Sequence, residues 1–88
     1  MKVKANLVLK EIAGANVVLP IGAATVDFTG ILTLNESGAM LWNLLLDGAT
    51  RDELALALTR EYEVELAEAA IDVDAFIEKL KSQDCLEF

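Results

Sequence analysis

The chain has 88 residues, of which 55% are hydrophobic and 25% are charged. This length allows one small domain, residues 1–88, and the apolar fraction excludes a disordered chain. Seven Lys and Arg residues against fifteen Asp and Glu residues give a net charge of −8. This negative charge argues against nucleic acid or an anionic membrane as the partner, because both attract cationic proteins.

Residue types that carry catalysis are scarce. The chain has no histidine, so it lacks the commonest general base and the commonest metal ligand. Its five glycines form neither a GxGxxG motif nor a phosphate-binding loop. We therefore expect a protein that is not an enzyme and that holds no metal and no cofactor.

The location of the protein is indicated by its cysteine and its apolar segments. The single cysteine, Cys85, has no second cysteine to pair with, which is typical of a reducing compartment. The longest stretch without a charged residue, 12–26, is shorter than the roughly 20 apolar residues that a membrane span needs. Lys10 and Glu11 interrupt the apolar run that a secretory signal would require. We expect a cytoplasmic protein.

Charge and composition change along the chain. The charges of residues 1–46 cancel, so residues 47–88 carry the whole excess of −8. The first third is rich in Val, Leu, Ile and Thr with Gly and Pro between them, whereas the rest is rich in Ala, Leu and Glu. This change predicts strands followed by helices.

Two strands are predicted near the N-terminus. Residues 7–13 have the alternation of a strand, and residues 14–16 (Gly-Ala-Asn) supply turn residues. Val17, Val18 and Leu19 start a second strand. Pro20 lacks a backbone N–H, so we expect that strand to end at Pro20 or to become an edge there.

A third strand, Ile31–Leu34, follows Gly30. Its alternation places the side chains of Leu32 and Leu34 toward the core, and those of Ile31 and Thr33 outward or toward a partner.

The first two helices have clear end signals. Asn35 is an expected N-cap, and Asp47-Gly48 ends the first helix near Leu46. This helix is apolar nearly all round, so we expect it to be buried on most sides, with Trp42 in the core. Thr50 and Glu53 form a capping box at the start of the second helix.

Apolar stripes mark the second and third helices. Leu54, Leu58 and Tyr62 share one face of the second helix, and a third helix is predicted over 66–82. The stripe of the third helix comprises Leu66, Ala69, Ala70, Val73, Phe76, Ile77 and Leu80. Cys85 and Leu86 are expected to return over the edge of the core. The predicted class is α+β, a short three-stranded antiparallel sheet followed by a winged-helix-like bundle of three helices.

The helical arrangement does not predict DNA binding. A recognition helix needs Arg, Lys, Asn or Gln toward the groove, whereas the third helix carries Glu68, Asp72, Asp74 and Glu78 against Lys79 and Lys81. The edge of the third strand is the better candidate site. It has no Lys, Pro or inward charge to block pairing, and a free edge beside an apolar helix can bind a peptide as an added strand. The alternatives are that the chain's own N-terminus covers the edge or that a second copy of the protein pairs with it as a structural or dimerisation module.

Three segments resemble the PqqD-like family, the relatives of pyrroloquinoline quinone biosynthesis protein D. They are Leu32-Thr-Leu-Asn-Glu-Ser-Gly-Ala-Met-Leu-Trp42, Asp47-Gly-Ala-Thr-Arg-Asp-Glu-Leu54, and Tyr62 with Asp72-Val-Asp-Ala-Phe-Ile77. The piece Leu-Asn-Glu-x-Gly-Ala-x-x-Trp is the most specific part, because amphipathic Ala/Leu/Glu helices are common.

The resemblance implies a peptide-recognition role. Members of this family bind the leader of a ribosomally made precursor peptide and present it to a modifying enzyme, often a radical S-adenosylmethionine enzyme. The implied binding site lies between the third strand and the third helix. Carried over to this chain, the peptide-binding residues are Gly30, Ile31, Leu32, Thr33, Leu34, Asp72, Phe76 and Lys79. The acidic residues Glu68, Asp72 and Asp74 add the hypothesis that the leader carries a basic residue beside its apolar anchors.

Overall fold

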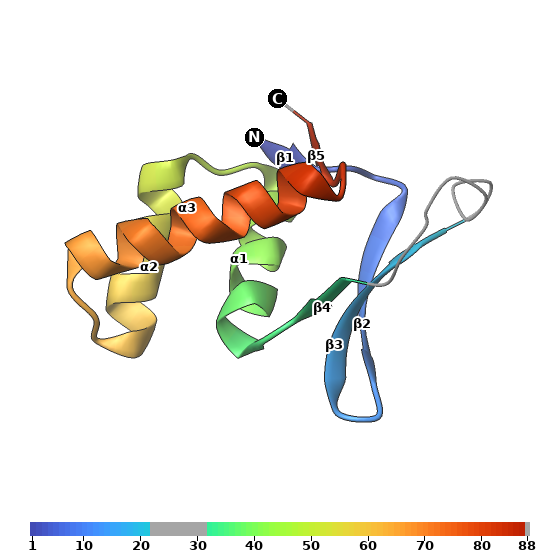
Figure 1. Cartoon of the computed structure of the whole chain (residues 1–88), viewed down its shortest axis with the longest axis horizontal. Coiled ribbons are helices and arrows are strands. Elements are labelled where there is room, and N and C mark those ends of the chain that lie inside the picture. The colour runs from blue at the N-terminus through green and yellow to red at the C-terminus, as the bar shows by residue number, and fades with distance from the viewer. Residues whose placement is uncertain (22–31, 88) are drawn as a thin grey trace.

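The computed structural model of the chain describes residues 1–21 and 32–87. In those residues the elements are β1 (Lys2–Val3), β2 (Leu7–Ile12), β3 (Ala15–Pro20), β4 (Leu32–Leu34), α1 (Glu36–Asp47), α2 (Arg51–Tyr62), α3 (Leu66–Ser82) and β5 (Leu86–Glu87). The antiparallel sheet β2-β3-β4 lies to one side of the three helices (Figure 1). The predicted α+β class is confirmed.

The β2–β3 hairpin turns more tightly than we expected. Ala13 and Gly14 both have positive φ angles, 52° and 83°, and Ile12 pairs with Ala15. Two central residues with positive φ are typical of the tight turns whose twist matches that of antiparallel strands. The prediction that Ala15 and Asn16 belong to the turn is therefore wrong, because both already pair within the strand.

Pro20 ends the central strand of this sheet. It lies opposite Leu7, and the neighbouring N–H of Ile21 donates to the carbonyl of Asn6 at 2.9 Å. Since hydrogen-bonded and non-hydrogen-bonded pairs alternate in an antiparallel ladder, Leu7 and Pro20 form a non-hydrogen-bonded pair. The N–H that proline lacks is not needed by β2.

Helix α1 begins and ends where the sequence predicts but is buried on one side only. The Asn35 side chain accepts from the N–H of Gly38 at 2.8 Å, and Gly48 follows the helix with φ of 97°. Trp42 is fully buried, as expected. Leu44 and Leu46 are 40% and 51% exposed, so the expected burial on most sides is wrong. The other elements cover one face of α1 and leave these leucines outside.

Helices α2 and α3 pack against each other through parts of their predicted stripes. The Thr50–Glu53 capping box is present. The buried residues are Leu54, Ala55 and Leu58 on α2, and Ala69, Val73, Ile77 and Leu80 on α3. Tyr62 and Leu66 are 39% and 54% exposed, contrary to expectation. Leu66 is the first residue of α3, and that turn lies at the end of the molecule farthest from the sheet (Figure 1).

The two chain ends lie side by side (Figure 1). β1 and β5 pair antiparallel, with Val3 opposite Leu86 and both side chains buried. Cys85 is completely buried, and its carbonyl accepts from the N–H of Lys4 at 2.9 Å. The return of Cys85 and Leu86 over the core is confirmed, whereas the strand pair itself was not predicted. Within the described residues, none of the helices is both long and apolar enough to span a bilayer.

Candidate functional site

The outer edge of β4 is the candidate site. The order β2-β3-β4 leaves β4 at the end of its sheet, and no other strand of residues 1–21 and 32–87 pairs with it. The N-terminal strand β1 pairs with β5 instead. The alternative that the N-terminus covers this edge is therefore wrong for the described part of the chain.

The pairing pattern shows which backbone groups face outward. The hydrogen-bonded pair Asn6–Ile21 sets the alternation along β2 and β3. It directs the N–H and C=O groups of Asn16 and Val18 toward β4, where these residues lie opposite Leu34 and Leu32. Thr33, between them, must direct its N–H and C=O groups away from β3. Thr33 thus presents one N–H donor and one C=O acceptor at an edge with which no other described strand pairs.

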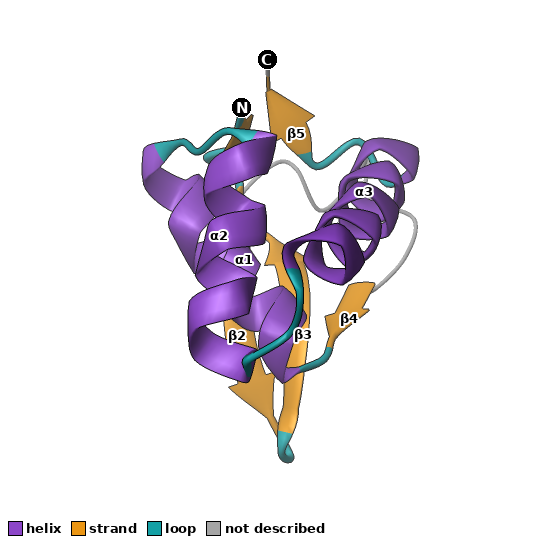
Figure 2. Ribbon diagram, turned by 90° about the vertical axis from the view of Figure 1, so that its left-hand side faces the viewer, coloured by secondary structure: helices purple, strands orange, loops and turns teal. Residues whose placement is uncertain are grey.

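A side chain from α3 confirms this orientation. The Nζ of Lys79 donates to the carbonyl oxygen of Thr33 at 3.2 Å. Both residues are exposed to solvent. The contact joins β4 to α3, which lie next to each other (Figure 2). A peptide N–H that paired with the Thr33 carbonyl oxygen would share this acceptor with the Lys79 ammonium group.

A cleft of about 510 Å³ lies between the β4 edge and α3. Its lining residues are Thr33, Leu34, Asn35, Ser37, Leu41, Leu58, Asp72, Ala75, Phe76 and Lys79. The α3 residues recur at spacings of three and four, which places them on one face of the helix. Phe76 is half-buried and the other three are exposed, so the helix offers one aromatic contact between a carboxylate and an ammonium group.

Gly38 allows this cleft to be narrow. A Cβ atom at Gly38 would lie 3.1 Å from Oδ1 of Asn35, 3.3 Å from Cβ of Leu34 and 3.5 Å from the Phe76 ring. The absence of a side chain therefore lets the start of α1 approach both β4 and α3.

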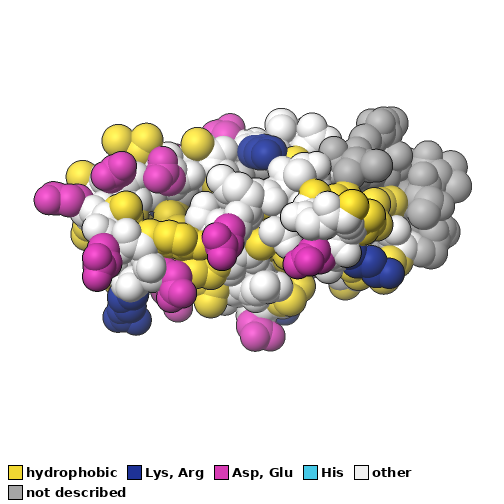
Figure 3. All heavy atoms as spheres, turned by 90° about the horizontal axis from the view of Figure 1, so that it is seen from below, with side chains coloured by type: hydrophobic (Ala, Val, Ile, Leu, Met, Phe, Trp, Pro, Cys, Tyr) yellow, Lys and Arg dark blue, Asp and Glu magenta, His cyan; other side chains and the backbone are white. Residues whose placement is uncertain are grey.

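A second cleft of about 340 Å³ adjoins the first. It is lined by Asn35, Glu36, Ser37, Leu58, Tyr62, Val64 and Asp72. Seen from below, the helical half of the molecule carries acidic side chains with apolar side chains exposed between them (Figure 3).

The structure brings together most of the residues that the sequence predicts for the site. Thr33, Leu34, Asp72, Phe76 and Lys79 line one cleft. Gly30 and Ile31 lie outside the described residues. Leu32 directs its side chain into the core, where it is 6% exposed, and its backbone toward β3.

Several lining residues were missed. They are Asn35, Ser37, Leu41, Leu58 and Ala75. Helical spacing from Asp72 and Phe76 could have found Ala75, whereas Leu58 comes from α2 and has no local signal. Within the described residues, no group of three or more acidic or cysteine side chains could hold a metal ion.

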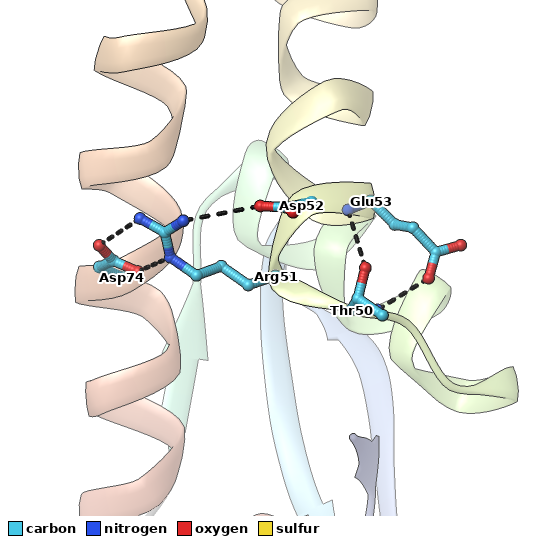
Figure 4. A network of polar contacts seen from close by, with 5 residues as sticks. All are labelled: Thr50, Arg51, Asp52, Glu53 and Asp74. Atoms are coloured by element: carbon cyan, nitrogen blue, oxygen red, sulfur yellow. Dashed lines mark hydrogen bonds and ion pairs between the residues drawn. The ribbon is translucent and has the colours of Figure 1, made fainter.

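Asp72 and Asp74 have different surroundings. The guanidinium group of Arg51 donates to both carboxylate oxygens of Asp74, with Nη2 at 2.8 Å from Oδ2 (Figure 4). This hydrogen bonding lowers the pKa of Asp74 and raises that of Arg51. Asp74 is thus occupied in linking α2 to α3. Asp72 lines both clefts.

Comparisons with known proteins point to one family. The sequence model of the family Coenzyme PQQ synthesis protein D (PqqD) matches residues 8–86. One solved structure, described as TbiB1 in complex with the TbiA(beta) leader peptide, is 26% identical with a TM-score of 0.79, over 99% of this chain and 95% of that chain. Another, lasso peptide synthetase B1 complexed with the leader peptide, is 28% identical with a TM-score of 0.71, over 92% and 89% of the two chains. Comparison with curated proteins found no match.

Proposed function

Because the chain belongs to the PqqD family, we propose that residues 1–88 form one recognition domain for the leader of a ribosomally made precursor peptide. The domain binds the leader and presents it to a modifying enzyme. The observation that carries this proposal is the outward-facing backbone of Thr33 beside a cleft of about 510 Å³.

Strand addition explains how such a domain binds peptides. The leader adds a strand to β4 and pairs with the N–H and C=O groups of Thr33, and its side chains enter the cleft beside Phe76. Backbone pairing tolerates many sequences, whereas the cleft selects side chains. Two similar solved structures are complexes with a leader peptide, which supports leader binding by this domain.

The proposed role is non-catalytic and requires no cofactor. The cleft offers a carboxylate, an ammonium group, amide and hydroxyl groups, and apolar side chains, which suit binding better than bond cleavage. We place the protein in the cytoplasm, where precursor peptides are synthesised and cysteines stay reduced.

The class of the modifying enzyme is a separate part of the proposal. The family resemblance favours a radical S-adenosylmethionine enzyme, whereas one similar solved structure is that of lasso peptide synthetase B1. Co-purification with the enzyme encoded next to this protein tests the first class. A radical S-adenosylmethionine partner would bring the visible absorption of an iron–sulfur cluster, and a colourless partner would contradict it.

The binding edge is tested by substituting Thr33. Proline at this position removes the outward N–H but no hydrogen bond to β3, because Thr33 and Val17 form a non-hydrogen-bonded pair. We expect Thr33→Pro to weaken leader binding at least tenfold, which corresponds to about 1.4 kcal/mol. The measurement is an amide-shift titration with the precursor peptide that is encoded next to this protein. Thr33→Val retains the N–H and should bind like the wild type.

The titration also locates the site. Shifts at residues 32–35 and along the α3 face from Asp72 to Lys79 agree with strand addition at β4. Undiminished binding by folded Thr33→Pro, or shifts confined to other elements, would refute it. Sedimentation without peptide tests the alternative of a dimerisation module, in which Thr33→Pro would convert a dimer into a monomer.

A further inference from the structure

The two clefts beside β4 form one continuous groove. They share Asn35, Ser37, Leu58 and Asp72. The larger cleft, which we call the first compartment, lies against Thr33 and Lys79. The smaller cleft, the second compartment, extends past the start of α1 toward Tyr62 and Val64. A peptide paired with β4 can therefore continue along the groove from the first compartment into the second.

The second compartment has an apolar floor and acidic sides. Leu58 is buried, Val64 is half-buried and Tyr62 is exposed at its rim. Glu36 and Asp72 are both exposed. Within residues 1–21 and 32–87, the carboxylates of these two residues form no ion pair or hydrogen bond, unlike that of Asp74, which Arg51 holds.

Charge differs between the two ends of the groove. Lys79 lies seven residues after Asp72 on α3, a separation of about 10 Å along a helix. An extended peptide covers this distance in about three residues. A cation on the peptide is thus attracted at the Asp72 end and repelled at the Lys79 end.

We propose that the second compartment binds an apolar side chain of the leader next to a Lys or Arg, whose cation pairs with Asp72 and Glu36. The inference rests on the proposed function, because it requires a peptide on β4, and it adds the chemistry of the side chains selected there. Of the acidic residues that suggested a basic leader, Asp72 is retained and Glu36 is added. Asp74 is excluded because Arg51 occupies it, and Glu68 because it lines neither compartment.

A displayed library of random peptides tests the proposal. Peptides of about 12 residues span about 40 Å when extended, enough to fill the groove. We expect selection on the wild-type protein to enrich peptides with Lys or Arg next to a large apolar residue, at one end of a strand-forming segment. An enriched peptide, labelled for fluorescence anisotropy, should bind Asp72→Lys about tenfold more weakly, since an attraction becomes a repulsion.

A matched variant separates this pairing from the general attraction of an acidic protein. Glu68→Lys makes the same change of charge one turn before Asp72 on α3 and should leave the affinity unchanged. Equal losses in Glu68→Lys and Asp72→Lys, or no enrichment of Lys and Arg, would overturn the inference.

Thr33→Pro distinguishes a failure of the acidic second compartment from a failure of the β4 binding site itself. If this variant loses the selected peptides but no basic residue is enriched, the acidic compartment is refuted and strand addition stands. If selected peptides bind Thr33→Pro as well as the wild type, the β4 site itself is refuted, together with the compartment that depends on it.

Discussion

Asn35 serves both the fold and the groove. Its side-chain oxygen accepts from the N–H of Gly38 at 2.8 Å and from the hydroxyl of Ser37 at 3.0 Å, and the residue lines both compartments. Loss of an N-cap acceptor costs about 1 kcal/mol. We expect Asn35→Ala to lower the free energy of unfolding by about that amount in urea denaturation.

Asn35→Asp is the matched control for this prediction. An aspartate retains the acceptor and suits the positive end of α1, so it should keep most of the stability. Equal stabilities of the wild type and Asn35→Ala would show that the cap contributes nothing to folding.

The contact between Arg51 and Asp74 acts at the scale of elements, because it joins the start of α2 to the middle of α3 (Figure 4). The Arg51 hydrogen bond lowers the pKa of Asp74. The contact therefore stabilises the folded protein fully at pH values above the ordinary pKa of an aspartate carboxyl group. This stabilisation is lost as the pH falls through the lowered pKa of Asp74. Both groups are exposed, so we expect a small effect.

A double-mutant cycle with Arg51→Gln and Asp74→Asn measures this contribution. The coupling free energy should be favourable near neutral pH, should decrease with added salt, and should vanish once Asp74 is protonated. A coupling that persists in strong acid would contradict the assignment to this ion pair.

The elements also show how far sequence alone determines this structure. Both ends of α1 and the start of α2 could be predicted, because a cap depends on residues within four positions, as in Asn35 with Gly38. The pairing of β1 with β5 could not, because two-residue strands have no periodicity and meet only through the whole fold. The same limit applies to the site. The β4 edge follows from a local pattern and the α3 residues from the family resemblance, whereas the second compartment arises from the packing of α2 beside α1 and α3.

At the scale of the whole molecule, the N-terminal residues contact both the loop between α1 and α2 and the residues that follow α3. The N–H of Ala49, between α1 and α2, donates to the carbonyl of Met1 at 3.0 Å. Lys4 contacts Asp84 through an ion pair of 2.8 Å, and its N–H binds the Cys85 carbonyl. Residues 1–4 thus link the loop between α1 and α2 to the end of α3.

Cys85 lies inside this junction and reports on its opening. Burial, with the Asp84 carboxylate adding to it, raises the pKa of the Cys85 thiol. Between the ordinary and the raised pKa, the unfolded chain releases a proton that the folded chain keeps, so the free energy of unfolding falls as pH rises. We expect urea denaturation to show a steeper fall above about pH 8.5 for the wild type than for Cys85→Ala. A thiol reagent should modify the native protein only as fast as the junction opens. Parallel pH dependences, or immediate modification, would show that the thiol is not enclosed.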